Sequence, residues 1–127
     1  MKYSAPSTFQ NRNAPEAASQ IVSGVFELEQ GRWRWMGDRA AILLKAPAQA
    51  RPVLVELFLP DQAPGRRVTV SLDGKPLLDV ELPRTGAHTL TTPPASGQTL
   101  TIAIDKTFSV AGDQRKLGLI LTAAGFR

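Results

Sequence analysis

Short apolar runs, separated by clusters of glycine, proline and aspartate, fill the chain from Ile21 to its end. Runs of this length are typical of β-strands, because a helix needs a longer amphipathic stretch to bury one face. The glycine and proline clusters mark the turns between them. We therefore predict an all-β domain without helices, with strands at roughly Val22 to Glu29, Arg32 to Met36, Ala40 to Ala46, Val53 to Leu59, Arg67 to Leu72, Leu77 to Leu82, His88 to Thr92, Thr99 to Asp105 and Leu117 to Ala123.

The sharpest local prediction is a hairpin centred on Asp73-Gly74. Apolar and polar residues alternate from Val68 to Leu72 and again from Leu78 to Leu82, so each flanking segment has one apolar face. Asp-Gly is favoured in two-residue hairpin turns because both positions need a positive φ. Pro83 cannot donate a hydrogen bond to a ladder, so we expect it to end the second strand.

The number of short strands indicates how the chain buries its apolar surface. Two antiparallel sheets packed face to face are the simplest solution, and we expect an all-β, antiparallel two-sheet β-sandwich of jelly-roll type. The 127 residues, 43% of them hydrophobic, are enough for one such domain. We place it at residues 21 to 127, after a flexible N-terminal arm or linker at residues 1 to 20. Within the arm, Ala14 to Gln20 are predicted to form one short helical turn.

The net charge of +4 comes from 15 basic and 11 acidic residues that are scattered along the chain. A nucleic-acid binder concentrates its basic residues on one face, so we expect no nucleic-acid partner. No apolar stretch has the length of a membrane helix, and the first residues lack the apolar region of a signal peptide. We expect a soluble domain with no direct membrane span, in the cytoplasm or associated with the cell envelope. The absence of cysteine fits either compartment.

Residues able to perform covalent chemistry are sparse. His88 is the only histidine, and its position after a glycine turn is typical of a surface strand residue rather than a catalytic base. Glu27 and Glu29 share a strand face, where paired carboxylates more often face solvent than form a hydrolytic pair. The acids of the loop from Asp105 to Arg115 are too sparse for the EF-hand pattern of a calcium site, which favours an Asp–Arg ion pair. We predict no enzyme activity, no metal and no cofactor; a small hydrolase using Glu or Asp is the weaker alternative.

The segment Arg32-Trp33-Arg34-Trp35 holds both tryptophans of the chain. On a strand, Trp33 and Trp35 share one face, and Arg32 and Arg34 share the other. Two interpretations are open: the rings anchor the core, or they stack on a sugar beside hydrogen-bonding neighbours. We favour a core position for at least one ring and an outward position for the arginines.

A ligand would then be held at the outer face of this segment and at the turn that follows it. The predicted ligand-binding residues are Trp33, Arg34, Arg39, Arg32, Asp38, Asp113 and Arg115. The first three are the leading candidates for direct contacts, and the last two are expected to order the neighbouring loop.

Two motifs resemble segments of a known group of proteins. The first, from Gly24 to Leu44, joins a Gly, an aromatic and a Glu to an Arg-Trp pair, a short turn and an Ala-rich strand. The second, from Asp105 to Leu121, joins an aromatic loop to an Asp-Xaa-Arg-Xaa-Leu-Gly motif and a last apolar strand. Both resemble the C-terminal β-sandwich accessory domains of bacterial glycosyltransferases and related cell-envelope glycan proteins. Val110 and Met36 depart from that pattern, where a proline and a small hydroxyl residue are common.

The resemblance implies a non-catalytic sandwich, similar to carbohydrate-binding modules, that helps a glycan-handling enzyme to find, hold or position its substrate or partner. The partners it implies are an oligo- or polysaccharide and a parent or partner glycosyltransferase. The alternative is a structural domain that mediates protein interaction or oligomerisation without binding a glycan. Exposure distinguishes the two, because an uncovered tryptophan in a groove favours sugar binding and a flat apolar sheet face favours a protein partner.

Overall fold

The computed structural model describes residues 8–10, 21–29, 33–112 and 115–126. These residues form strands and loops, and since they contain no helix, none of them belongs to a helical membrane span. The strands are β1 (Thr8–Gln10), β2 (Ile21–Glu29), β3 (Trp33–Leu43), β4 (Val53–Leu59), β5 (Arg67–Leu72), β6 (Lys75–Glu81), β7 (Gly86–Thr91), β8 (Thr99–Ile104) and β9 (Leu119–Phe126). The predicted bounds of β4 and β5 are confirmed.

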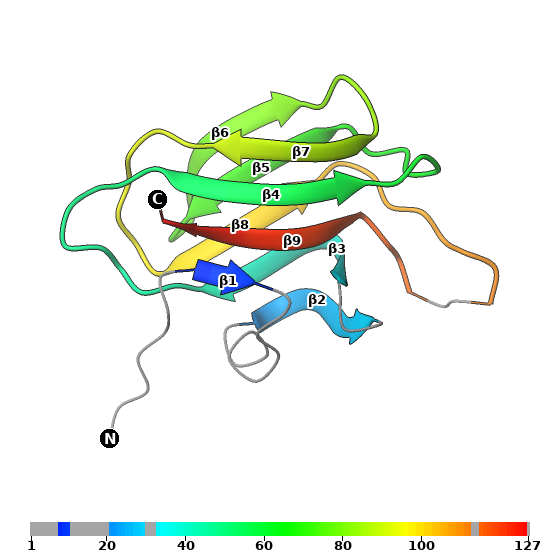
Figure 1. Cartoon of the computed structure of the whole chain (residues 1–127), viewed down its shortest axis with the longest axis horizontal. Helices are drawn as coiled ribbons and strands as arrows, with labels where there is room; N and C mark the ends of the chain where they lie inside the picture. Colours follow the sequence, from blue (N-terminus) through cyan, green and yellow to red (C-terminus); the bar gives the residue numbers. More distant parts are fainter. Residues whose placement is uncertain (1–7, 11–20, 30–32, 113–114, 127) are drawn as a thin grey trace.

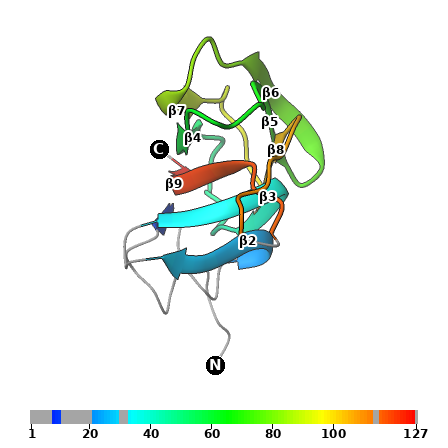
Figure 2. The same ribbon diagram turned by 90° about the vertical axis from the view of Figure 1, so that its right-hand side faces the viewer.

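The strands form one antiparallel sheet that curls on itself. Its order is β6-β5-β8-β3-β9-β4-β7, with β1 added beside β9 and β2 beside β3. Figure 1 shows β4 and β9 in front of β5 and β8, and Figure 2 shows the ladder turning between these two layers by way of β3. The prediction of an all-β, antiparallel fold is confirmed, but the hydrogen-bonded ladder is continuous from one layer to the other.

The sheet curls around β3. Residues 34–36 of this strand pair with β9, whereas residues 39–43 pair with β8. The sequence predicted two separate strands here, with a break from Gly37 to Arg39. That prediction is wrong, because the chain changes its partner strand at this point while staying extended. The break in the apolar pattern therefore marks a change of pairing rather than a loop.

The core lies between the two layers. Along β4, buried and exposed side chains alternate, so one face packs inward and the other faces outward. The buried apolar side chains of the long strands form one contiguous cluster. Its fully buried members include Met36, Ile42, Leu44, Leu57, Leu59, Leu100, Ile102, Leu119 and Leu121.

The predicted hairpin is present between β5 and β6. Asp73 has a φ of 50° and Gly74 a φ of 84°, which is the backbone conformation that a two-residue hairpin turn of this kind requires. The Asp73 carboxylate also accepts hydrogen bonds from the backbone amides of Gln98 and Thr99, the latter at 2.9 Å. The turn is thus fastened to the start of β8.

Part of the predicted N-terminal arm belongs to the sheet. Thr8, Phe9 and Gln10 pair with Gly125, Ala124 and Ala123 of β9. They extend the edge of β9 along which β3 pairs with residues 119–121. The rest of the arm, residues 1–7 and 11–20 with the predicted helical turn, lies outside the described residues.

Asp105 fastens the end of β8 to the start of β5, and this contact predicts a pH dependence of stability. Its Oδ1 accepts hydrogen bonds from the backbone amides of Arg66 at 2.9 Å and Arg67 at 3.0 Å. The bond from Arg67, followed by that from Arg66, holds the pKa of the Asp105 carboxyl below its ordinary value. The stabilisation is therefore complete above the unfolded-state pKa of about 4 and disappears as the pH falls through the lower folded-state pKa.

We expect Asp105→Asn to lower the free energy of unfolding near neutral pH and to weaken its decrease under acid. Urea unfolding at about pH 7 and about pH 3 measures both effects. Asp38→Asn is the matched control, because Asp38 is exposed on β3. If the free energy of unfolding depends on pH in the same way in Asp105→Asn and Asp38→Asn, the Asp105 contact does not stabilise the fold as described.

Candidate functional site

The predicted site residues fall into three groups in the structure. Arg32, Asp113 and the side chain of Trp33 lie outside what the structure describes. Arg34 and Trp35 are adjacent on β3 and differ in exposure, while Asp38 and Arg39 are exposed further along the same strand. Arg115 is half-buried in the loop before β9. The predicted Asp–Arg ion pair in that loop stays a prediction, because Asp113 is one of the residues outside the description.

Arg34 corrects the prediction that the arginines of this segment face outward. Arg34 is only 6% exposed to solvent. It pairs with Leu121 across the β3–β9 ladder, and directly opposed residues share a face, so Arg34 lies on the face that buries Leu121 and Met36. The alternation was predicted correctly, but its direction was reversed, because Met36 and Ile42 set which side of β3 packs inward.

Trp35 lies on the opposite face and begins a row of apolar side chains across three strands. Trp35 is opposite Ile120 of β9, and Ile120 is opposite Phe58 of β4. Direct partners share a face, so the three side chains stand side by side on the outer surface. Trp35 and Ile120 are half-buried, and Phe58 is 43% exposed. We call Trp35, Ile120 and Phe58 the aromatic row.

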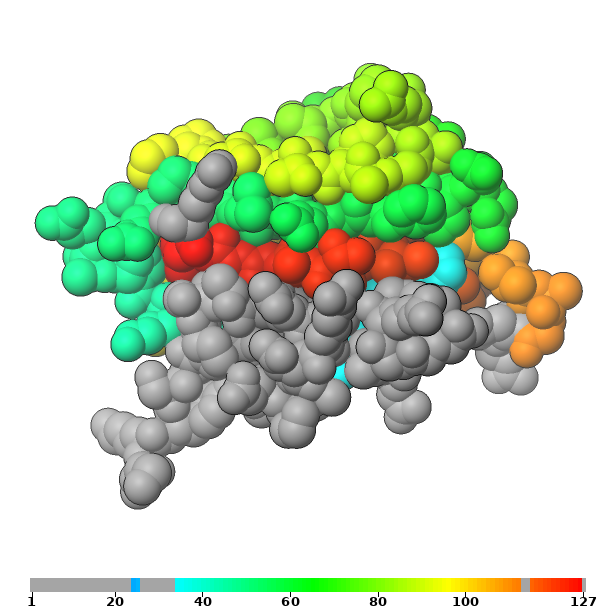
Figure 3. Space-filling model, in the orientation of Figure 1, coloured from blue at the N-terminus to red at the C-terminus, as the bar shows by residue number. Residues whose placement is uncertain are grey.

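Polar groups flank this row. Glu56 precedes Phe58 by two residues on β4 and is exposed on the same face. It is opposite Thr89 of β7, which is also exposed. In the space-filling view, β7, β4 and β9 form a broad open surface above the grey residues (Figure 3). The outer face thus combines apolar surface with a carboxylate and a hydroxyl.

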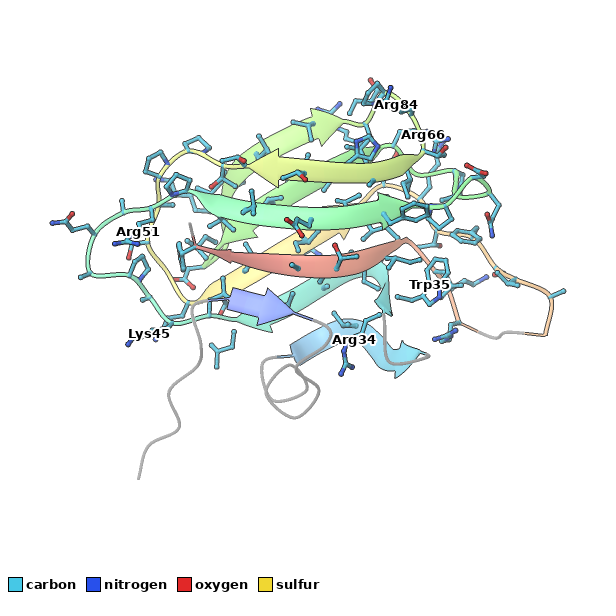
Figure 4. All side chains as sticks on the ribbon, in the orientation of Figure 1. Arg34, Trp35, Lys45, Arg51, Arg66 and Arg84 are labelled. Carbon is cyan, nitrogen blue, oxygen red and sulfur yellow. The ribbon has the colours of Figure 1, made fainter. Side chains whose placement is uncertain are left out.

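The loop between β8 and β9 supports the aromatic row at its β3 end. Phe108 packs edge-on against Trp35, with ring centroids 5.7 Å apart and an interplanar angle of 69°. Two backbone hydrogen bonds join Phe108 to Leu117, and the amide of Gly118 donates to the Met36 carbonyl at 2.8 Å. Figure 4 shows Trp35 beside this loop and Arg34 directed away from it. The second predicted motif therefore packs against the first through an aromatic pair.

Arg39 lines a shallow hollow on the other layer, over the outer face of β3, β8, β5 and β6. The hollow has a volume of about 340 Å³. Its lining combines one long cationic side chain, three hydroxyl side chains and three small apolar residues: Arg39, Thr69, Ser71, Gly74, Pro76, Thr101 and Ala103. It contains no aromatic side chain, so it offers hydrogen bonds without a stacking surface.

A larger pocket, of about 500 Å³, lies at one end of the curled sheet between the β3–β4 loop and the end of β9. Its lining residues are Lys45, Ala46, Pro47, Ala48, Gln49, Arg51 and Phe126. Sequence reasoning missed it, because its residues match no motif and Phe126 is distant from the loop in sequence. The available signal was a short segment with two cations and no acid between two strands.

His88 and the acidic residues are the remaining candidates for covalent or metal chemistry. His88 Nε2 lies 2.7 Å from the backbone carbonyl oxygen of Arg84, so this ring nitrogen is engaged by the main chain. No three His, Asp or Glu side chains within the described ranges gather in a way that would hold a metal ion.

The fold is similar to part of a solved enzyme structure. A crystal structure of an exo-β-1,3-galactanase from Phanerochaete chrysosporium with β-1,3-galactotriose matches with a TM-score of 0.52 over 98% of this chain, at 17% sequence identity. The chain spans 29% of the length of that protein. Neither a protein-family model nor a curated protein matches the sequence. The chain thus has a β-rich fold that resembles a segment of a carbohydrate-active protein.

Proposed function

We propose that this chain is a non-catalytic carbohydrate-binding accessory module that holds a glycan on the aromatic row. The observation that carries the proposal is the alignment of Trp35, Ile120 and Phe58 on one exposed face. Sugar rings have apolar C–H faces, which pack on aromatic side chains, and hydroxyl edges, which need hydrogen-bonding groups. The aromatic row supplies the packing surface, and Glu56 and Thr89 beside it supply the hydrogen-bonding groups.

The shape of the surface favours a chain-like ligand over a small one. Trp35 and Phe58 belong to strands that are separated by β9, so their backbones stand about 10 Å apart. An open face of this width contacts more than one sugar unit without enclosing any of them. Weak binding of an oligo- or polysaccharide is the expected behaviour of such a surface, because an open face leaves much of the ligand in water.

The finer fold and the parent protein belong to this proposal as well. We propose that the curled sheet is a jelly-roll-like sandwich, whose two layers enclose one core and are joined through β3. The motifs around Trp35 and Gly118 resemble accessory domains of bacterial glycosyltransferases. On this proposal the module positions a glycan for such an enzyme.

A protein partner is the second candidate. The aromatic row lies on the outer face of the sheet, and an apolar sheet face suits the surface of another protein. On this alternative, Phe58 would be an anchor in a pocket of a parent enzyme.

A glycan array probed with the full chain tests the proposal. We expect binding to one class of glycan, and a loss of about fivefold in affinity for Phe58→Ser, because an aromatic contact contributes on the order of 1 kcal/mol. Val110→Ser is the matched control: Val110 is similarly exposed, at 41%, and lies in the loop before β9, outside the aromatic row. Its affinity should stay unchanged. Failure to bind across all glycan classes would favour the protein-partner alternative.

A further inference from the structure

The pocket between the β3–β4 loop and β9 has a composition distinct from that of the aromatic row. Two cationic side chains, Lys45 and Arg51, stand on its lining, together with the amide of Gln49. The other lining residues are apolar, among them Pro47 and Phe126. A volume of about 500 Å³ lies in the range of pockets that take a small organic ligand.

The cations of this pocket are available to a ligand. Lys45 and Arg51 are both exposed, and the ion pair within the described residues is formed elsewhere, by Arg67 and Asp79. The chain from residue 44 to residue 52 contains no acid. The described residues that line the pocket therefore carry two positive charges and no negative one.

Hydrogen bonds hold the loop in place at both ends. The Leu44 amide donates to the Gln98 carbonyl at 2.7 Å. Arg51 and Ala95 exchange two backbone hydrogen bonds of 2.9 Å each, and the Ser96 hydroxyl donates to the Pro47 carbonyl at 3.3 Å. A loop that is fixed in this way loses little conformational entropy when a ligand enters.

We propose that this pocket is a second binding site, which takes the carboxylate-bearing ring of an acidic sugar. Arg51 can hold a carboxylate through two parallel hydrogen bonds, and Lys45 adds a second positive charge. Pro47 and Phe126 offer apolar surface to the ring, and Gln49 can bond a hydroxyl. The neutral aromatic row and the cationic pocket then act on different groups of a glycan, and the pocket does not depend on the row.

An anionic membrane surface is the rival ligand, and the geometry argues against it. A membrane-binding loop presents cations together with large apolar side chains that can enter the lipid. The exposed tip of this loop consists of Ala48, Gln49 and Ala50, which are small or polar. The cations line a concavity instead, as suits a ligand that enters it. In Figure 4, Lys45 and Arg51 lie together at one end of the molecule, and Arg66 and Arg84 lie at the other.

The test uses isotope-labelled full chain and a linear trimer of galacturonic acid as the probe. We expect backbone NMR shifts at residues 44–52 and at Phe126, and no comparable shifts with the neutral galactose trimer. Replacing both cations, Lys45→Gln with Arg51→Gln, should weaken the affinity by at least about tenfold, since each charge-assisted hydrogen bond is worth more than a neutral one. Phe58→Ser should leave this binding unchanged, which separates the pocket from the proposed function of the aromatic row.

A second double variant controls for overall charge. Arg84→Gln with Lys106→Gln removes the same net charge from exposed positions away from the pocket lining. Equal weakening by both double variants, or no binding of the acidic trimer, would overturn the proposal. So would two other results: inorganic phosphate shifting the same amides as strongly as the trimer, or binding to phosphatidylserine vesicles in place of the trimer.

Discussion

Replacing Gly118 by valine is expected to destabilise the protein strongly. A Cβ at this position would lie 2.3 Å from the backbone oxygen of Gly37 and 2.7 Å from the Ile104 side chain. Both neighbours are fixed, because Gly37 is inside β3 and Ile104 is part of the core. To relieve the clash, the loop before β9 must move away from β3. This movement breaks the hydrogen bond from the Gly118 amide to the Met36 carbonyl.

The cost is about 3 kcal/mol, at the upper end of the range for overpacking in a core. For a domain of this size, that lowers Tm by roughly 10 °C, which thermal unfolding followed by circular dichroism measures. Gly37→Ala is the matched control on the other side of the same contact: its Cβ would meet only the Lys116 oxygen, at 3.5 Å. A valine variant as stable as this control would show that the two segments are not in the close contact described.

Arg34→Ala is expected to reduce stability rather than to abolish ligand binding directly. Arg34 is 6% exposed and shares its face with Leu121 and Met36. Alanine removes both the aliphatic stem and the guanidinium, which leaves a void and takes hydrogen-bond donors from a buried region. We expect a loss of about 2 to 4 kcal/mol in the free energy of unfolding, measured by urea titration.

Arg39→Ala provides the comparison, since Arg39 is exposed on the same strand. We expect it to change stability by less than about 0.5 kcal/mol, as surface substitutions usually do. Glycan binding should follow the folded fraction in Arg34→Ala. A fully stable Arg34→Ala protein with lost binding would instead restore the outward, ligand-binding role predicted from the sequence.

Local patterns predicted those elements that local chemistry controls. The bounds of β4 and β5 follow from apolar runs with turn residues at both ends. The hairpin at Asp73-Gly74 follows from the positive φ that an Asp-Gly turn adopts. Neither depends on which distant strand lies alongside.

Local patterns do not predict which distant strands pair with one another. The join of two predicted strands into β3 depends on β8 and β9, which follow it by more than fifty residues in the sequence. The strand β1 was missed because three residues within a polar segment carry no period, and they are extended because β9 offers an edge. The inward direction of the Arg34 side chain also depends on pairing with a distant strand, β9.

The candidate sites were only partly visible from the sequence. The alternation around Trp35 indicated a two-faced strand, and a sugar platform was one of the open interpretations. Ile120 and Phe58 could not be joined to it, because a shift of one residue in the register would turn either side chain to the other face. The pocket at Lys45 and Arg51 depends on Phe126, which only the curl of the sheet brings beside the β3–β4 loop.

The segment with both tryptophans separates what a local pattern predicts from what strand pairing determines. The order of residues was enough to predict that the part of the chain described by the structure is built of strands, that Asp73-Gly74 turns a hairpin, and that Trp35 and Arg34 face opposite sides. Strand pairing in the folded molecule was needed to show that Arg34 is the buried one and that Trp35 stands in a row with Ile120 and Phe58. The reason is physical: alternation is a property of one strand, whereas the choice of face and the neighbours on it are properties of the register between strands.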